Sequence, residues 1–269
     1  MRYLKGGQFF GQTNETNIFD GAILTDVVYT HQKVDWHYHE NPYFTFILRG
    51  NLIEGNKREV LSCTNGALIY HNWQEPHYNI KPDGYTRGFH IELDRKWKLG
   101  LDYDFDLLQG STLILDPQTR LRMYRIFRES KINDDASRLT IQGLILEILD
   151  DINPGRKYFS LRKPAWISRL REVINDRYCE HISLAELSSI LQVHPVHLSR
   201  EFPKHFNCSM GEYIRKLRIE KSLLLMTGTK YTLTQIASEC GFADQSHYIR
   251  CFREALGVSP LVFRKFLIR

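Results

Sequence analysis

The chain has 269 residues, of which 42% are hydrophobic and 25% charged, so it is long enough for two domains that each bury a core. No apolar run is long enough to span a bilayer, and the N-terminus lacks the apolar core of a signal peptide. The five scattered cysteines form no CxxC pair, which predicts neither a zinc finger nor a disulfide framework. Together these features predict a cytoplasmic protein. Residues 160–269 carry 17 Lys/Arg against 10 Asp/Glu, whereas residues 1–159 carry 19 against 21. A basic C-terminal half favours binding of a polyanion, and a solvated basic face is the alternative.

Residues 23–93 contain short β-rich runs in which apolar residues alternate or cluster. Residues 43–48 and 88–93 are examples, and turn residues such as Gly50 and Gly66 separate the runs. Several short strands at regular spacing are typical of a sandwich or a small barrel. We therefore predict an all-β domain over residues 1–115.

Histidines gather near the start of this β-rich half. His37 and His39 lie two positions apart, and imidazoles at this spacing share one face of a strand, so a transition-metal site is geometrically possible. Hydrogen bonding to a small polar ligand and a purely structural role are the alternatives. The candidate effector-binding residues are His37, His39, Tyr43, His77, Trp36 and Tyr70, although an aromatic β-core looks the same in sequence. The candidate metal ligands are His37, His39 and His77.

Together with Gly50 and Gly66, these histidines are similar to the two motifs of the cupin β-barrel, and the resemblance implies a cupin-like sensor domain. In metal-bearing cupins an HxH pair, a downstream Glu and a later His bind the metal. Tyr43 occupies the place of that Glu here, and Glu40 would have to point across the pleat to replace it. We expect no cofactor, with a divalent metal as the open alternative.

The apolar period changes after residue 116. Pro117 suits the first turn of one helix, and a second helix has apolar residues at 141, 145, 148 and 152, the 4-3-4 spacing of a coiled-coil seam. We predict a helical dimerisation segment over residues 116–153 and a homodimer formed through helices 117–152. The alternative is a stripe packed on its own domain. Residues 154–163, which begin with Pro and Gly, predict a linker.

Residues 164–269 show the start and stop signals of successive helices. The pairs Ser183 and Glu186, Ser209 and Glu212, and Thr232 and Gln235 all fit the capping box. Asn207 and Gly257 suit the left-handed residue that ends a helix. These signals predict an all-α domain over residues 164–269.

One short helical unit occurs twice in this domain, fifty positions apart. Leu198-x-Arg200-x-Phe202 recurs as Tyr248-x-Arg250-x-Phe252. Each copy has the pattern of a helix-turn-helix, so we predict two such units at about residues 183–206 and 232–256.

The second helix of each unit leaves a polar face open, and a helix that enters the major groove presents such a face to bases and phosphates. Arg215, Lys216, Arg218 and Lys221 add a basic face to the helix that joins the units. The predicted DNA-contacting residues are Val196, Ser199, Arg200, Lys204, Lys216, Gln245, Ser246, His247, Arg250 and Arg253.

Residues 236–260 resemble the signature of the AraC/XylS family of bacterial transcription regulators in both spacing and residue type. The resemblance implies a sequence-specific regulator, more often an activator, without enzymatic activity. Its expected partners are double-stranded DNA, a small-molecule effector and RNA polymerase. No association with a membrane is expected. The alternative is a cupin-type metalloenzyme with an appended helical domain, and the missing Glu counts against it.

The first unit departs from the family pattern. Ser188, Gln192 and His194 stand where the family usually has Ala, Gly and Ser. Pro203 falls inside the recognition helix, where a proline costs about 3 kcal/mol because it removes a hydrogen bond and clashes with the preceding turn. We therefore predict that this helix either ends before Pro203 or kinks there. Base readout then depends mainly on Gln245, Ser246 and Arg250.

Overall fold

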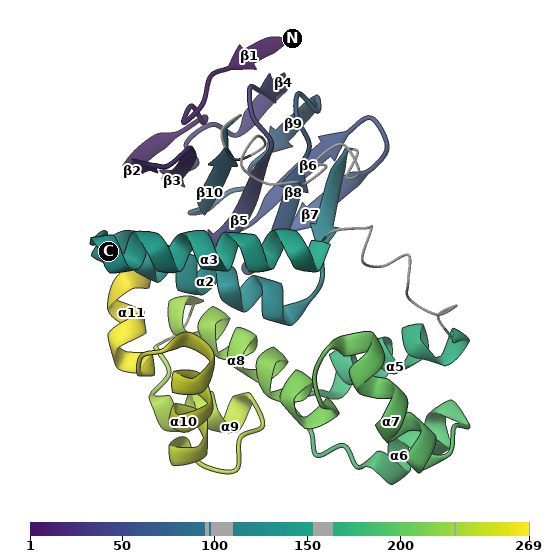
Figure 1. The fold of residues 1–269 in the computed structure, drawn as a ribbon. Helices are drawn as coiled ribbons and strands as arrows, with labels where there is room; N and C mark the ends of the chain where they lie inside the picture. The colour runs from purple at the N-terminus through teal and green to yellow at the C-terminus, as the bar shows by residue number, and fades with distance from the viewer. Residues whose placement is uncertain (95–96, 98–109, 153–163, 229, 269) are drawn as a thin grey trace. The chain divides into compact units, whose positions relative to one another are not determined.

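The computed structural model describes residues 1–94, 97, 110–152, 164–228 and 230–268, and the chain divides into two compact units, Met1–Pro154 and Gly155–Arg269 (Figure 1). The predicted linker over residues 154–163 lies outside the described residues, as does residue 153 at the end of the predicted dimerisation segment. Within the described part of the chain, no helix is both long and apolar enough to cross a membrane.

The first unit begins with strands, which confirms the all-β fold class predicted for this half. In chain order they are β1 (Arg2–Leu4), β2 (Gln12–Phe19), β3 (Ala22–Val28), β4 (Lys33–His39), β5 (Tyr43–Arg49), β6 (Leu52–Asn56), β7 (Val60–Cys63), β8 (Leu68–His71), β9 (His77–Ile80), β10 (Arg87–Leu93) and β11 (Ser111–Ile114).

The strands form two sheets that share an interior. One sheet has the order β1-β4-β9-β6-β7 and the other β11-β8-β5-β10-β3-β2. Ile47 and Ile69 from the six-stranded sheet and Leu52 from the five-stranded sheet belong to one buried apolar cluster. Because successive residues in a strand point to opposite faces, every second side chain of each sheet points into this interior.

Two helices, α2 (Pro117–Ile132) and α3 (Asp135–Ile152), follow the strands and lie along the six-stranded sheet (Figure 1). Pro117 lies in the first turn of α2, as the sequence predicts, and Asp116 caps the helix. Phe46 of β5 contacts Tyr124 of α2 edge-on, with ring centroids 4.6 Å apart, and Phe89 of β10 contacts Phe127 at 5.3 Å. These aromatic contacts join the outer face of the sheet to α2.

The apolar seam of α3 is buried inside its own unit. Ile141, Ile145 and Ile148 are each 1% exposed. Of the two alternatives for this seam, the structure favours the stripe packed on its own domain. A homodimer through helices 117–152 remains a prediction, and its contact would use the opposite face of α3, where Leu139 and Leu146 are exposed.

The regular elements among the described residues of the second unit are all helices, which confirms the predicted fold class of this half. Its helices are α5 (Ala165–Arg177), α6 (Leu184–Leu191), α7 (Pro195–Phe206), α8 (Met210–Gly228), α9 (Leu233–Glu239), α10 (Gln245–Leu256) and α11 (Pro260–Ile268). The pairs α6–α7 and α9–α10 have the order of two helix-turn-helix units, and the long helix α8 joins them (Figure 1).

Local sequence signals place the ends of these helices. Two predicted capping boxes are complete, those of Ser183 with Glu186 and of Thr232 with Gln235. In the third, Ser209 Oγ accepts from the Glu212 N–H at 3.2 Å, while the Glu212 carboxylate pairs with Lys216 at 2.7 Å. Asn207 and Gly257 end α7 and α10 in the left-handed conformation, as predicted.

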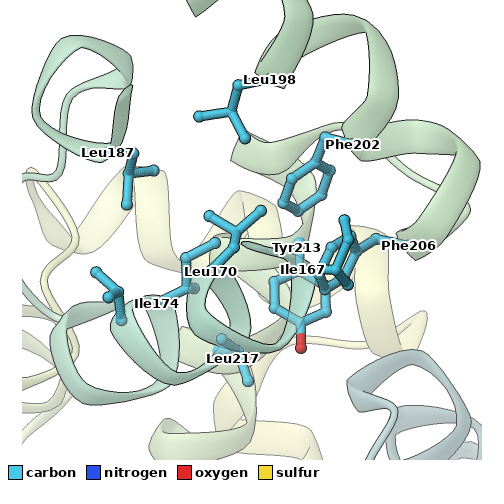
Figure 2. Close-up of a cluster of buried hydrophobic side chains, with 10 residues drawn as sticks. Ile167, Leu170, Ile174, Leu187, Leu198, Phe202, Phe206, Tyr213 and Leu217 are labelled. Carbon is cyan, nitrogen blue, oxygen red and sulfur yellow. The ribbon is translucent and has the colours of Figure 1, made fainter. Parts of the chain in front are cut away.

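Each helix-turn-helix unit has an aromatic core. Figure 2 shows the first, in which Leu170 of α5, Leu187 of α6 and Phe202 of α7 converge. In the second unit Tyr248 and Phe252 of α10 are completely buried. Burying a side chain of this size stabilises a fold by roughly 1.5–3 kcal/mol, so these residues hold each recognition helix against its supports.

Helix α7 continues through Pro203 to Phe206, so of the two predicted alternatives the early end is wrong, and a kink at Pro203 stays a prediction. The proline ring leaves one intrahelical hydrogen bond unmade. However, Leu198, Phe202 and Phe206 pack into the core on both sides of Pro203 and keep the segment helical. Tertiary burial therefore overrides the local preference.

Candidate nucleic-acid interface and histidine pocket

Helix α10 presents a polar face opposite its buried aromatic side. Asp244 begins the helix by accepting a hydrogen bond from the His247 N–H at 2.7 Å. Ser246, Arg250 and Arg253 are exposed and line one open hollow on the helix surface. Three of the predicted DNA-contacting residues are thus brought together on one accessible face.

The cations of this face are available to a ligand. Neither Arg250 nor Arg253 forms an ion pair with any residue that the structure describes. A guanidinium in this state can donate two hydrogen bonds to guanine or to a phosphate. Gln245 is half-buried, and its Oε1 accepts from the Thr234 hydroxyl at 2.6 Å, so α9 orients it. The sequence analysis missed Thr234, because only packing of α9 against α10 reveals its role.

Helix α7 exposes the predicted residues of the first unit, but one of its cations is paired. Val196, Ser199 and Arg200 are exposed. Lys204 is also exposed and forms an ion pair with Glu201 at 2.7 Å. This pair would have to open, or be shared, for Lys204 to contact a phosphate.

The basic face of α8 is largely used inside the unit. Arg218 donates to the backbone oxygens of Tyr178 at 2.6 Å and Glu180 at 2.8 Å. Lys221 donates to the backbone oxygen of Glu239 at 2.8 Å. These two cations therefore hold the chain segments around α8 and are not free for DNA, which the sequence pattern alone did not reveal.

The interior between the two sheets contains the predicted histidines. His37 of β4 lies next to His77 of β9, with ring centroids 4.2 Å apart, and His39 lies 5.7 Å from His77. All three are buried, and one nitrogen from each lies within 4.8 Å of the others. The Tyr43 hydroxyl is 2.9 Å from His77 Nε2. The structure thus brings four of the six predicted effector-binding residues together.

Trp36 and Tyr70 lie outside this cluster. Because neighbours along a strand point to opposite faces, Trp36 points away from His37 and Tyr70 away from His71. Trp36 is 39% exposed, and the ring of Tyr70 packs 5.1 Å from that of Phe44. The structure therefore gives neither residue a place in the pocket.

Polar residues in and around the pocket were also missed, among them His71, His90 and Glu54. His71 lies opposite Tyr43 in the β5–β8 ladder, and His90 lies opposite Thr45 in the β10–β5 ladder. The buried Glu54 carboxylate is 3.2 Å from His71 Nδ1. Residues opposite each other in a ladder share a face, so the strand pairing would have found both histidines, but that pairing is not readable from the sequence.

Burial keeps the pocket uncharged. It lowers the pKa of His77 and of His90 to about 3, and it also lowers the pKa values of His37, His39 and His71. The same burial raises the pKa of Glu54 to about 8. Near neutral pH the interior therefore offers neutral imidazoles and a mainly protonated carboxyl group.

The three predicted ligands fit a divalent transition metal. His37 and His77 donate their Nδ1–H to the backbone oxygens of Asp35 at 2.9 Å and Glu75 at 3.0 Å. Each Nε2 therefore carries a lone pair, as in most metal-binding histidines, but that of His77 accepts from the Tyr43 hydroxyl, which a metal would have to displace. His39 Nδ1 is buried without a hydrogen-bond partner among the described residues.

The carboxylate of the family pattern has no equivalent here. Tyr43 occupies its position and hydrogen-bonds His77. Glu40 does not replace it, because Glu40 is exposed and accepts a hydrogen bond from the Gly6 N–H. Three neutral imidazoles with a tyrosine suit zinc, copper, iron or nickel better than magnesium or calcium.

Residues 187–265 match the family model described as a helix-turn-helix domain. Together with the geometry of α6–α7 and α9–α10, this match defines the second unit as a tandem helix-turn-helix domain. Residues 236–260, whose signature resembles the AraC/XylS family, lie within this match.

Curated relatives have matching regions. The HTH-type transcriptional regulator GbdR of Pseudomonas aeruginosa is 36% identical over 81 residues, which cover 30% of this chain and 22% of GbdR. The Msm operon regulatory protein of Streptococcus mutans is 27% identical over 125 residues, 46% of this chain and 42% of that protein. The uncharacterized HTH-type transcriptional regulator SACOL0084 of Staphylococcus aureus is 23% identical over 231 residues, 81% of this chain and 31% of that protein. The chain spans less than half the length of these relatives.

Solved structures that match this chain include ToxT from Vibrio cholerae, with a TM-score of 0.39 and 16% identity over 91% of this chain and 99% of that one. The C-terminal domain of AraT, a response regulator from Geobacillus stearothermophilus, has a TM-score of 0.37 and 28% identity over 39% of this chain and 88% of that one.

Proposed function

We propose that the chain is a sequence-specific DNA-binding transcription regulator that responds to a small-molecule effector. The observation that carries the proposal is the exposed polar face of α10, on a helix-turn-helix domain, with two arginines that form no ion pair within the described residues. The names of the relatives, which are regulators and not enzymes, support this function over a cupin-type metalloenzyme.

DNA is contacted by the N-terminal turns of α7 and α10, each in the major groove. The two helices address successive groove segments roughly one helical turn apart. In α10, Gln245, Ser246 and Arg250 read base edges, while Arg253 and His247 contact the backbone. In α7, Arg200 has the position that Arg250 has in the repeat.

The effector binds in the histidine pocket, and β10 connects this pocket with α2. His90 points into the pocket, while its neighbour Phe89 contacts Phe127 of α2 on the other face. An effector that binds one arrangement of these elements more tightly shifts the population toward it. A second copy of the chain, bound through helices 117–152, and RNA polymerase are the further partners that we propose.

Selection of bound DNA sequences from a random pool, with and without extracts that contain candidate effectors, tests the proposal. We expect one enriched motif with two half-segments about one helical turn apart, and an affinity that changes with one extract. A pool that stays random would remove the DNA-binding function. Enzymatic activity without DNA binding would favour the metalloenzyme, and metal analysis of the purified protein tests that alternative directly.

A further inference from the structure

The histidine pocket is already occupied by a ring that the chain itself supplies. Phe9, which precedes β2, stacks on His90 with ring centroids 3.7 Å apart and an interplanar angle of 12°. The same ring lies 4.8 Å from the His39 ring. Phe9 therefore takes the position that a flat ligand would take against these two imidazoles.

With Phe9 in place, the pocket has no room for an organic ligand. The free cavity bounded by Phe9, Phe10, His37, Glu54 and other pocket residues measures about 10 Å³, which is about enough for one water molecule. A small-molecule effector can enter only if part of this lining moves. His37 and Glu54 lie in paired strands of the sheet, whereas Phe9 and Phe10 lie outside the strands.

The segment that carries Phe9 has features that allow it to move. Gly7 and Gly11 flank it with φ angles of +78° and +139°, which glycine adopts at low cost. Between β1 and Phe9, the backbone is tied to the domain by hydrogen bonds from the Gly6 N–H to Glu40 at 3.1 Å and from the Gly7 N–H to Glu92 at 2.9 Å. Phe9 is also partly exposed, so its departure does not require the sheets to open.

We propose that Phe9 is an internal substitute for the effector, and that the effector is a small, uncharged aromatic compound with one hydrogen-bonding group, which stacks on His90 when Phe9 leaves. The inference rests on the proposed function, because it takes the histidine pocket as the effector site.

Three observations define this class of ligand. The flat stacking surface of His90 selects a planar ring. The histidines and Glu54 of the pocket are almost completely buried, so an ionised ligand would lose its hydration there. The buried His39 Nδ1 has no hydrogen-bond partner among the described residues, so a ligand hydroxyl group would satisfy it.

Isothermal titration calorimetry of the full chain without DNA tests the inference, with phenol as the probe. Phe9→Ala removes the internal competitor, so its affinity for phenol should exceed that of the wild type by at least about tenfold. Tyr3→Ala is the matched control, because this nearby aromatic residue packs on Tyr38 at 5.5 Å, is 42% exposed and does not line the pocket. Its phenol affinity should stay close to that of the wild type.

Matched probes test the chemistry. Cyclohexanol has the size and the hydroxyl group of phenol but no aromatic face, and benzoate has the ring but a charge. Both should bind Phe9→Ala more weakly than phenol does. If Phe9→Ala gains no affinity for phenol, Phe9 does not compete with a ligand and the inference is overturned. Equal binding of cyclohexanol overturns the aromatic class, and binding of zinc alone, without phenol, overturns the inference in favour of a metal.

Two further measurements keep the outcomes distinct. If circular dichroism shows that Phe9→Ala is unfolded, Phe9→Leu retains the apolar bulk without the ring, and it must still bind phenol more tightly than the wild type does. DNA affinity is measured separately, without phenol, on the selected site. Phenol binding without DNA binding contradicts the proposed function alone, whereas DNA binding without phenol binding contradicts the role of Phe9 alone.

Discussion

The two units keep their polar side chains in opposite places. The N-terminal unit buries histidines, Glu54 and the ion pair of Asp26 with Arg87 in its interior. The C-terminal unit has an apolar core and carries its polar groups, among them Arg250, on the surface. The difference matches the size of the proposed ligands. A small molecule is recognised when protein surrounds it, whereas DNA must be met on an exposed face.

A second contrast lies within the C-terminal unit. Helices α7 and α10 have the same position in the repeat and the same kind of aromatic core. Yet α7 contains Pro203 and pairs Lys204 with Glu201, while Arg250 and Arg253 of α10 form no ion pair within the described residues. The repeat thus preserves the scaffold more faithfully than it preserves the contact surface.

The largest expected difference between the two units is their stability in acid. Burial lowers the pKa of His90 from 6.5 to about 3, so the unfolded chain takes up a proton in this window and the folded chain does not. The stability that His90 contributes is full above pH 6.5 and is lost as the pH falls toward about 3. The described residues of the C-terminal unit include no buried histidine. In a pH titration followed by circular dichroism, the N-terminal unit, with its strands and helices α2 and α3, should unfold at a higher pH than the C-terminal unit.

The pKa of Glu54 has the opposite consequence. Burial raises it from 4.5 to about 8, so the stability that it contributes is full below pH 4.5 and is lost as the pH rises toward about 8. Glu54→Gln should therefore flatten the alkaline side of the titration. A single transition of both units in acid would contradict the contrast between them.

Asp26→Ala should destabilise the N-terminal unit by about 3–5 kcal/mol, because it leaves the buried Arg87 guanidinium without its carboxylate. Asp26 accepts from Arg87 at 2.7 Å and from Lys131 at 2.6 Å. Glu201→Ala is the control, since it breaks the exposed pair with Lys204 in the other unit and should cost about 0–1 kcal/mol. Urea unfolding measures both, and similar losses would show that burial does not govern these pairs.

Pro203→Ala should stabilise the first helix-turn-helix unit by up to about 3 kcal/mol, because it restores a hydrogen bond inside a helix that is already formed. Thermal unfolding measures the gain. Ser199→Ala, on the exposed face of the same helix, is the control and should change stability by no more than about 0.5 kcal/mol. An unchanged midpoint for Pro203→Ala would mean that α7 accommodates the proline without cost.

Arg250→Ala should weaken binding to the selected DNA by about 1–3 kcal/mol and relax the preference at one base pair. Arg200→Ala is the matched change in the first unit, fifty positions earlier in the repeat. Fluorescence anisotropy on the cognate site and on single-base variants measures both. If Arg250→Ala lowers the DNA affinity equally on every sequence, Arg250 contacts only phosphate. If Arg200→Ala loses as much specificity as Arg250→Ala does, both units read bases.

Lys216→Ala should have the smallest effect, a uniform weakening on all sequences with the salt slope lowered by about 1. Lys216 already pairs with Glu212 at 2.7 Å, so DNA must compete with this carboxylate. Binding measured over a series of salt concentrations gives the slope. An unchanged slope would mean that Lys216 belongs to the internal contacts of α8, as Arg218 and Lys221 do.

Local sequence signals were enough to predict where many of the helices begin and end. Ser183 and Thr232 begin their helices, and Asn207 and Gly257 end theirs, at the predicted positions. Such signals are readable because a cap and its backbone partner lie within a few residues of each other. The histidine pocket was only half predicted for the opposite reason. His71 and His90 join it through strand pairings with β5 that span many residues.

The repeat, the helix caps and the alternation of the strands are properties of the sequence alone, since each depends on neighbours within one or two turns or on the strict period of a strand. Tertiary structure decided the rest. It kept α7 helical through Pro203, buried the seam of α3, committed Arg218 and Lys221 to backbone oxygens, and placed Phe9 on His90. Each of these outcomes depends on contacts between segments far apart in the chain, where burial and hydrogen bonding outweigh local preference.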